Sequence, residues 1–271
     1  VEPPEDLVIT NVTSRSGIVT WNNPNNLTGT LYGYSLHILN DSSCTREVIW
    51  KCTDCQGAFP NLTTSCLNAF QLTASSTALL GPQYYEAVAL FPDTNYTVDV
   101  AAITGNGKGY KASKHLPTKE EAPLKPLNVM VKNITAKTAT VEWSMDEVRP
   151  GQTTYIITAI GISPAEMRTH SVSGYFNRKY EFIDLEEYWN YSVIVQAYTS
   201  IGSSQSDPVN FTTPAGPAGN VSLFNINKGT GDYAYVTAVV SWKLPLVLDR
   251  NGPIDKFYVQ QNERNEPIIS R

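Results

Sequence analysis

The sequence predicts an all-β chain made of repeated β-sandwich modules. Segments rich in β-branched residues end in a tryptophan at three places, as strands that pack a core often do. Each of the first two tryptophans is followed by a tyrosine with valines at alternate positions after it, so one frame of residues is repeated. No stretch keeps a period of 3.6, so helices should be short or absent. The frame residues expected in the cores are Trp21, Tyr96, Trp143, Tyr191 and Trp242.

The strands are expected where β-branched or alternating apolar residues concentrate. The tryptophan strands cover residues 17–21, 139–143 and 236–242, and the tyrosine strands cover residues 96–103 and 191–198. Further strands are expected at residues 31–39, 154–160 and 180–185. Turn-forming residues separate the strands at 22–26, 105–109 and 149–152.

A leucine stands six residues before each frame tyrosine: Leu90 before Tyr96, and Leu185 before Tyr191. The first segment carries the full pattern Leu-x-Pro-x-Thr-x-Tyr, and the second lacks the proline and the threonine. These residues resemble the tyrosine corner of the fibronectin type III repeat, a seven-stranded Greek-key sandwich of about 100 residues. The resemblance implies that the tryptophans end the second strand and that residues 251–259 form the third strand of a further repeat.

The frame divides the 271 residues into three units, in keeping with domains of about 100 residues. We expect repeats at residues 1–118 and 119–214, and at 215–271 a partial repeat with only its first three strands. Residues 115–126 and 213–219, which contain several prolines, are the expected linkers of an elongated, semi-rigid rod. The adjacent acidic pairs Glu120-Glu121 and Glu186-Glu187 are expected to be solvated surface.

The first repeat contains an insertion. Trp21 and Tyr96 are 75 residues apart, whereas Trp143 and Tyr191 are 48 apart, and the excess lies at about residues 40–80. All four cysteines fall in this interval, and their even number predicts two disulfides. We expect Cys44–Cys52 with Cys55–Cys66, each closing a local loop, and the interleaved pairing stays open. A Cys52–Cys55 bridge is the least favoured, because a two-residue gap favours strained, redox-type bridges.

Two other uses of the cysteines fit the sequence poorly. A zinc site would need a second close cysteine pair, and a thioredoxin-like redox pair would need a βαβ setting. Three aromatic residues, Trp50, Phe59 and Phe70, lie in or beside the insertion. We favour a small core beneath the inserted loop for them, and they are also the candidate contacts for a protein ligand.

Nine Asn-x-Ser/Thr sequons point to an extracellular glycoprotein. Asn95 and Asn190 each precede a frame tyrosine, so their side chains should point away from the core, where a glycan can be attached. The candidate glycosylation sites are Asn11, Asn26, Asn40, Asn61, Asn95, Asn133, Asn190, Asn210 and Asn220.

Charge and hydropathy exclude some classes of partner. The formal charge of −5 gives no reason to expect binding to nucleic acid or to an anionic membrane. No apolar run reaches the roughly 20 residues that a membrane-spanning helix needs, so this segment is not expected to insert directly into a membrane. Val1 is not followed by a signal-like segment, so a leader or anchor of the parent protein would lie outside this sequence.

Catalytic motifs are absent from the sequence. The three histidines, His37, His115 and His170, are scattered, and there is no nucleophile motif or phosphate-binding loop. No arginine follows a cysteine by six residues, as the catalytic loop of tyrosine phosphatases would require. We therefore expect no catalytic residue, no cofactor and no metal site, and a catalytic domain could exist only elsewhere in a parent protein.

The expected function is that of an extracellular binding or spacer segment. The tandem repeats resemble the ectodomains of receptor-type tyrosine phosphatases and of neural adhesion receptors. Neither Arg-Gly-Asp nor the Trp-Ser-x-Trp-Ser motif of cytokine receptors is present. The partner would be an extracellular protein ligand or receptor, bound through loops or through the disulfide-braced insertion. The alternative is a purely structural spacer in a matrix or receptor protein, with no ligand on these modules.

Overall fold

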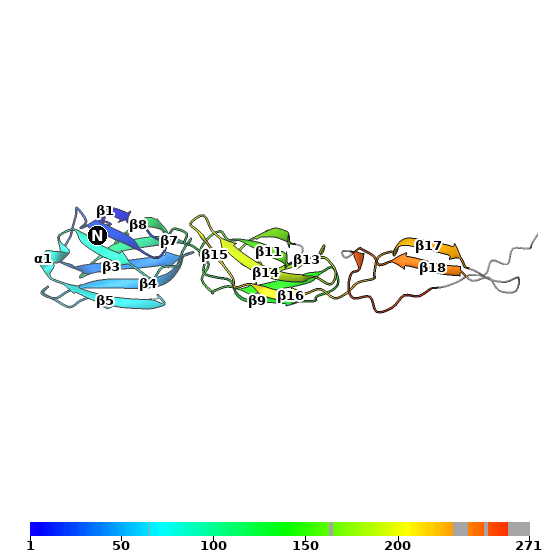
Figure 1. Cartoon of the computed structure of the whole chain (residues 1–271). Coiled ribbons are helices and arrows are strands. Elements are labelled where there is room, and N and C mark those ends of the chain that lie inside the picture. The colour runs from blue at the N-terminus through cyan, green and yellow to red at the C-terminus, as the bar shows by residue number, and fades with distance from the viewer. Residues whose placement is uncertain (65, 163–164, 230–237, 247–248, 260–271) are drawn as a thin grey trace, which may run out of the picture.

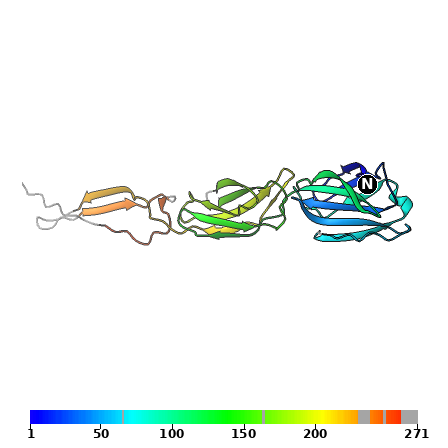
Figure 2. The same cartoon turned by 180° about the vertical axis from the view of Figure 1, so that it is seen from behind.

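The computed structural model describes residues 1–64, 66–162, 165–229, 238–246 and 249–259. The chain forms two β-sandwich modules and a two-stranded sheet that follow one another end to end (Figure 1). The view from behind shows the same succession (Figure 2). Within the described residues no helix is long and apolar enough to cross a membrane. The all-β prediction is therefore confirmed.

The first module has one sheet of three strands and one of five. The smaller sheet has the order β1-β2-β6, formed by β1 (Glu5–Thr10), β2 (Gly17–Asn22) and β6 (Gln83–Ala87). The larger sheet has the order β5-β4-β3-β7-β8. Its strands are β3 (Leu31–Asn40), β4 (Ser43–Cys52), β5 (Asn68–Ala74), β7 (Asn95–Thr104) and β8 (Gly107–Pro117). A single turn of helix, α1 (Ser76–Leu79), precedes β6.

The second module repeats this plan without a counterpart of β5. The sheet β13-β10-β9 contains β9 (Leu127–Lys132), β10 (Ala139–Ser144) and β13 (Lys179–Phe182). The facing sheet has the order β12-β11-β14-β15, with β16 also paired to β14. Its strands are β11 (Thr154–Ile162), β12 (Ala165–Ser173), β14 (Asn190–Tyr198), β15 (Ser203–Gln205) and β16 (Val209–Thr212).

The repeated frame forms the centre of each core, as predicted. Trp21 and Tyr96 are 1% and 3% exposed, and Trp143 and Tyr191 are 4% and 0% exposed. Both tyrosine corners are present. The Tyr96 hydroxyl accepts a hydrogen bond from the backbone N–H of Phe91 at 3.0 Å, and the Tyr191 hydroxyl accepts one from Glu186 at 2.8 Å. The second corner therefore forms without the proline and threonine of the first.

The third unit differs from its prediction. β17 (Ser222–Lys228) pairs with β18 (Ala238–Lys243), and part of the expected tryptophan strand, Val236 and Thr237, lies outside the described residues. Residues 251–259 form no strand, so the expectation of three strands is wrong for the described part of this unit. In the complete modules the third strand is held between two neighbours, and no such neighbours are described here. Trp242 is consequently half-buried and contacts Phe257 at a ring distance of 5.4 Å.

The junction between the modules is more structured than its composition predicts. The expected linker at 115–126 begins too early, because β8 continues to Pro117 and pairs with the start of β7. Glu121 receives two hydrogen bonds from the Arg15 guanidinium, at 2.5 and 3.0 Å, and Arg149 lies 2.6 Å from Asp93 across the junction. Glu120 accepts a hydrogen bond from the backbone of Gln152 at 2.6 Å.

The acidic pairs are therefore not plain solvated surface. Glu120 and Glu121 bind groups of both modules at the junction. In the other pair, the side chain of Glu187 is only 9% exposed and lies 3.5 Å from the Lys137 ammonium. Sequence composition predicts an exposed acidic run, whereas the turns of the sandwiches bring donors to these carboxylates.

Candidate interaction site on the first module

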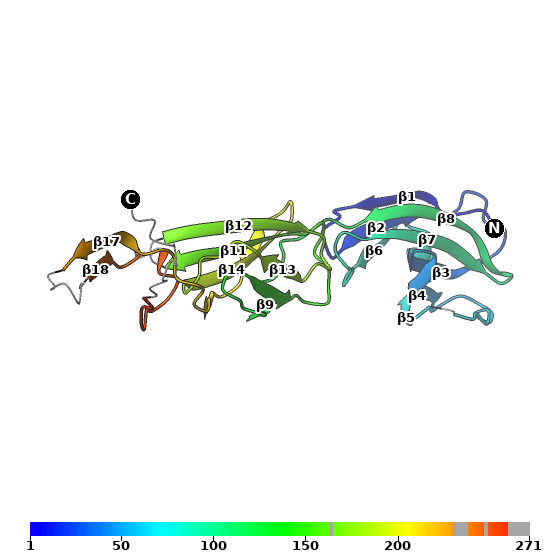
Figure 3. The same ribbon diagram turned by 90° about the vertical axis from the view of Figure 1, so that its right-hand side faces the viewer.

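The insertion adds a strand to the larger sheet of the first module. The described residues after β4, 53–64 and 66–67, lead to β5, which runs parallel to β4, from Arg46 beside Asn68 to Cys52 beside Ala74. Tyr32 anchors the returning loop through a hydrogen bond of 2.6 Å from its hydroxyl to the Gln56 carbonyl. Figure 3 shows β5 at the outer end of the sheet, beyond β4. The insertion is thus a fixed part of the module and not a loose loop.

Two disulfides hold the insertion, as the cysteine count predicts, but the favoured pairing is wrong. The bridges are Cys44–Cys66 and Cys52–Cys55, with Cα–Cα distances of 4.7 and 5.7 Å. Cys44 and Cys52 lie near opposite ends of one extended strand, about 26 Å apart at the usual rise per residue, far beyond the reach of a disulfide. The parallel return of the chain instead places Cys66 beside Cys44, and the turn after β4 brings Cys55 to Cys52.

A cluster of charged side chains lies on the outer face of this sheet. Glu47 of β4 is 1% exposed and accepts contacts from Lys108 Nζ at 2.7 Å and from His37 Nε2 at 2.9 Å. Ser35 donates to the same carboxylate oxygen at 3.3 Å. Burial raises the pKa of Glu47, but hydrogen bonds from Lys108, Thr64 and His37 outweigh it and lower the pKa to about 2. Glu47 is therefore ionised at neutral pH.

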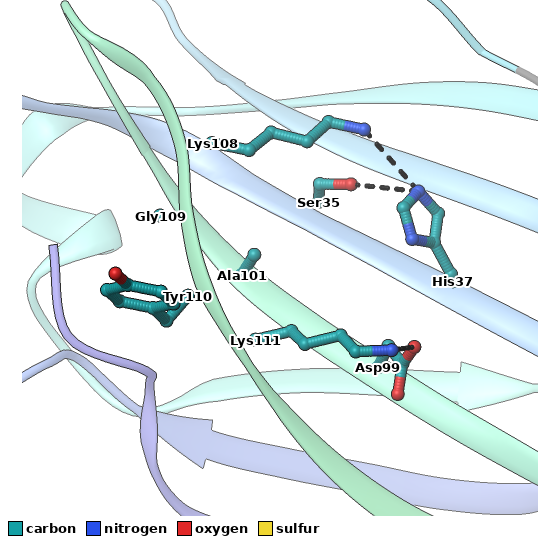
Figure 4. Close-up of a pocket in the computed structure, with 8 residues that line it drawn as sticks. All are labelled: Ser35, His37, Asp99, Ala101, Lys108, Gly109, Tyr110 and Lys111. Atoms are coloured by element: carbon teal, nitrogen blue, oxygen red, sulfur yellow. Dashed lines mark hydrogen bonds and ion pairs between the residues drawn. The ribbon is translucent and has the colours of Figure 1, made fainter.

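A second buried carboxylate continues the cluster on β7. Asp99 is 4% exposed and binds the Lys111 ammonium at 2.6 Å and the Ser113 hydroxyl at 2.6 Å. A pocket of about 260 Å³ lies between the two groups (Figure 4). It is lined by Ser35, His37, Asp99, Ala101, Lys108, Gly109, Tyr110 and Lys111.

The pocket is bounded by two charged pairs and one exposed aromatic ring. It is smaller than the roughly 300–1,000 Å³ of small-molecule sites. Lys108 and Lys111 are each paired with a buried carboxylate, so they offer fixed hydrogen-bond donors and little free positive charge. Tyr110 stands at the rim and is 76% exposed, and exposed tyrosines are frequent anchors of protein interfaces.

The three aromatic candidates of the insertion have three different positions. Trp50 is 6% exposed and belongs to the main core, where its ring meets Trp21 at 5.2 Å and Tyr85 at 5.6 Å. It is not a surface contact, because β4 is an inner strand whose Trp50 faces the other sheet. Phe59 is half-buried, with the Lys51 ammonium 5.1 Å from its ring, and Phe70 on β5 is 51% exposed. The insertion therefore has no separate small core built by all three.

The sequons lie where glycans have room, and their occupancy stays a prediction. Asn40 is half-buried, and the other eight asparagines are exposed. Asn95 and Asn190 point outward beside the buried Tyr96 and Tyr191, as the alternation of strand residues requires.

The cysteines provide no metal ligands in this structure. Two groups of possible ligand atoms lie close together, His37 with Glu47 and Cys66, and Cys52 with Asp54 and Cys55. The three cysteines of these groups are in disulfides and have no thiolate to offer. Among the described residues, neither group therefore supplies three suitable ligands.

The charged cluster was not found from the sequence, although part of its signal was present. Alternation along β3 places Ser35 and His37 on the face opposite Tyr34 and Leu36. The same rule places Asp99 opposite Val98 and Val100. What the sequence does not reveal is that β4 and β8 bring Glu47, Lys108 and Lys111 to these positions, because their pairing depends on strand register.

A family model for the fibronectin type III domain matches residues 2–119 and 124–212. Tyrosine-protein phosphatase Lar of Drosophila melanogaster is 30% identical over 186 residues, which are 66% of this chain and 9% of that protein. Receptor-type tyrosine-protein phosphatase F of Mus musculus is 28% identical over 204 residues, 68% of this chain and 10% of that protein. Phosphatidylinositol phosphatase PTPRQ of Homo sapiens is 26% identical over 202 residues, 74% of this chain and 8% of that protein.

The chain thus spans about a tenth of the length of the curated relatives it matches. Among solved structures, the chicken CNTN1 FN1-FN3 domains are 14% identical with a TM-score of 0.49, covering 89% of this chain and 85% of that one. The two sandwiches, their tyrosine corners and the match over both modules lead to one conclusion. The chain belongs to the fibronectin type III family, and its matched residues are repeats of that family and not a catalytic domain.

Proposed function

We propose that this chain is an extracellular segment of a cell-surface receptor or adhesion protein, and that it binds a protein ligand through the first module. Its relatives include proteins named as receptor-type tyrosine-protein phosphatases, and it resembles a small part of each. The two disulfides and the exposed sequons suit an extracellular setting. A phosphatase activity, if the parent protein has one, would belong to another region.

The observation that carries the proposal is the pocket on the outer face of the first module. Its walls are held by two lysines that pair with buried carboxylates, Lys108 with Glu47 and Lys111 with Asp99, so the donors that face a partner are already held in place. Preordered donors lower the entropy cost of binding. Tyr110 at the rim adds an exposed ring that can be buried in a complex.

The test compares two exposed tyrosines of the same module. The full chain, made in secreting animal cells, is screened against purified animal cell-surface ectodomains, and the ligand found is titrated with variants. Tyr110→Ser should weaken binding about 30-fold, the effect of losing an anchor residue worth about 2 kcal/mol. Tyr84→Ser, which alters a tyrosine 57% exposed on the three-stranded sheet, should leave binding unchanged.

A ligand whose affinity is unaffected by Tyr110→Ser would contradict the proposed site. Deleting the insertion from Cys44 to Cys66 is a poorer test, because it would remove β4 and with it Trp50 and Val48 of the core.

The second candidate function is that of a structural spacer without a ligand. It is favoured by the junction, where Arg15 and Glu121 and then Arg149 and Asp93 tie the first two modules end to end. If no ectodomain binds the chain, while substitutions at the junction shorten or bend the rod in small-angle scattering, the spacer function is the better account.

A further inference from the structure

The strand β5 presents an open edge to the solvent. It is the last strand of its sheet, and no other described strand pairs with its far side. Leu67, just before β5, donates its backbone N–H to Cys44 at 3.2 Å. Because successive residues of a strand direct their backbone groups to opposite sides, those of Asn68, Phe70 and Leu72 point away from β4. These groups are available to a further strand.

This edge lacks the features that usually prevent pairing with another molecule. Natural edge strands are commonly protected by charges, prolines or bulges. The segment from Leu67 to Ser75 contains no charged residue and no proline, and its register with β4 is continuous. The outermost strand at the corresponding edge of the second module, β12, instead carries Glu166 and Arg168, which are paired at 2.7 Å.

The side chains of β5 also leave apolar surface uncovered. Phe70 and Leu72 lie beside the buried Val48 and Trp50 and point to the same side of the sheet, yet they are 51% and 41% exposed. The facing sheet has only three strands, so β5 extends beyond its cover. A partner strand on this edge would gain both backbone hydrogen bonds and apolar contacts.

We propose that β5 pairs antiparallel with β5 of a second copy of this chain, with Gln71 on the two-fold axis. A two-fold interface requires a self-complementary surface, and the sequence around Gln71 satisfies this requirement. In this register Phe70 faces Leu72 of the second copy, so four apolar side chains form one patch. Ala69 faces Thr73, and the two Gln71 amides face one another on the opposite side of the sheet. The strand itself carries no charge, and the Arg46 guanidinium of β4 lies 6.0 Å from the centre of its Phe70 ring.

The test places charges on the two-fold axis. Because the contact is small, we expect a weak dimer, visible by sedimentation velocity of the full chain as its concentration rises from about 10 to 500 µM. Gln71→Lys and Gln71→Glu should each be monomeric, since two like charges would lie directly opposite one another. An equimolar mixture of the two variants should recover the dimer.

The control is Ser171→Lys, an equal charge change at an exposed position on the edge strand of the second module, and it should dimerise like the unaltered chain. Gln71 is exposed, and unchanged near-ultraviolet circular dichroism would show that its variants are folded. An unaltered chain that stays monomeric throughout, a Gln71→Lys variant that still dimerises, or a mixture that stays monomeric would each overturn the proposal. The inference makes no use of the pocket ligand, so binding at Tyr110 can fail while the dimer stands.

Discussion

The two complete modules share an inner frame but differ on the outer face of their larger sheets. Tyr34 of β3 lies opposite Trp50, and the corresponding Tyr155 of β11 lies opposite Val172. Three residues further along each strand, the first module has the pair His37 and Glu47. The second module has Thr158 and Thr169, whose hydroxyls are 3.3 Å apart.

The difference continues on the next strand and shows where each module is specialised. Asp99 of β7 pairs with His37, and its counterpart Ile194 of β14 pairs with Thr158. A charged network around two buried carboxylates in the first module thus stands where the second has threonine and isoleucine. The inner frame accounts for the fold, because it is the same in both modules. The outer face and the strand β5 are what distinguish the first module, so functional tests belong there.

The largest expected effect on stability comes from one pair of corresponding positions in the cores of the two modules. Trp50→Ala should destabilise the first module by about 3–5 kcal/mol, because it empties a large buried site between Trp21 and Tyr85. Val172→Ala, at the corresponding position, should cost the second module about 1 kcal/mol, because Val172 is smaller and half-buried. Urea unfolding combined with hydrogen–deuterium exchange would assign each loss to its module. Equal losses would show that β4 adds no more to its core than β12 does.

The buried carboxylate gives the next largest effect, and it depends on pH. The pKa of Glu47 is lowered from 4.5 to about 2, so its contribution to stability is present above about pH 4.5 and is lost as the pH falls towards 2. Glu47→Gln should therefore destabilise the first module by about 2–3 kcal/mol at pH 7. The difference between the unaltered chain and the variant should shrink in acid.

The measurement is the unfolding free energy of both proteins from pH 7 to pH 2. Thr169→Val, at the matching position of the second module, supplies the control, because it removes a hydroxyl without changing a titratable group. A Glu47→Gln difference that does not change with pH would mean that the ion pair with Lys108 does not stabilise the folded state.

The sequence predicts the frame well because each of its residues acts locally. In the first two modules the tryptophan strands, the tyrosine strands and the leucine six residues before each tyrosine lie where the patterns place them. Strand register is harder to predict from the sequence, because it depends on which strands pair with one another. The prediction of the disulfide pairing failed for this reason, because nothing local indicates that residues 43–52 form one strand with β5 parallel to it.

The candidate site could not be predicted from the sequence for the same reason, because it also depends on strand pairing. Its residues come from β3, β4, β7 and β8, and none belongs to a known motif. The aromatic residues of the insertion were the visible signal in the sequence. Trp50, however, belongs to the main core, because it lies beside the buried Tyr34 on the neighbouring strand. Tyr110, which has no conspicuous sequence context, is left exposed beside the pocket.

The smallest expected effect tests the part of the comparison in which the modules should be alike. Tyr96→Phe and Tyr191→Phe each remove one hydroxyl that accepts a backbone hydrogen bond, from Phe91 and from Glu186. Each should cost its own module about 1–2 kcal/mol, because the ring stays in place and one partly buried N–H loses its partner. The two losses should agree, although only the first corner has the proline and the threonine. The same unfolding and exchange experiment measures both losses of unfolding free energy. A loss at Tyr96 several times that at Tyr191 would mean that Pro92 and Thr94 strengthen the first corner. The two corners would then be equal in geometry but not in energy.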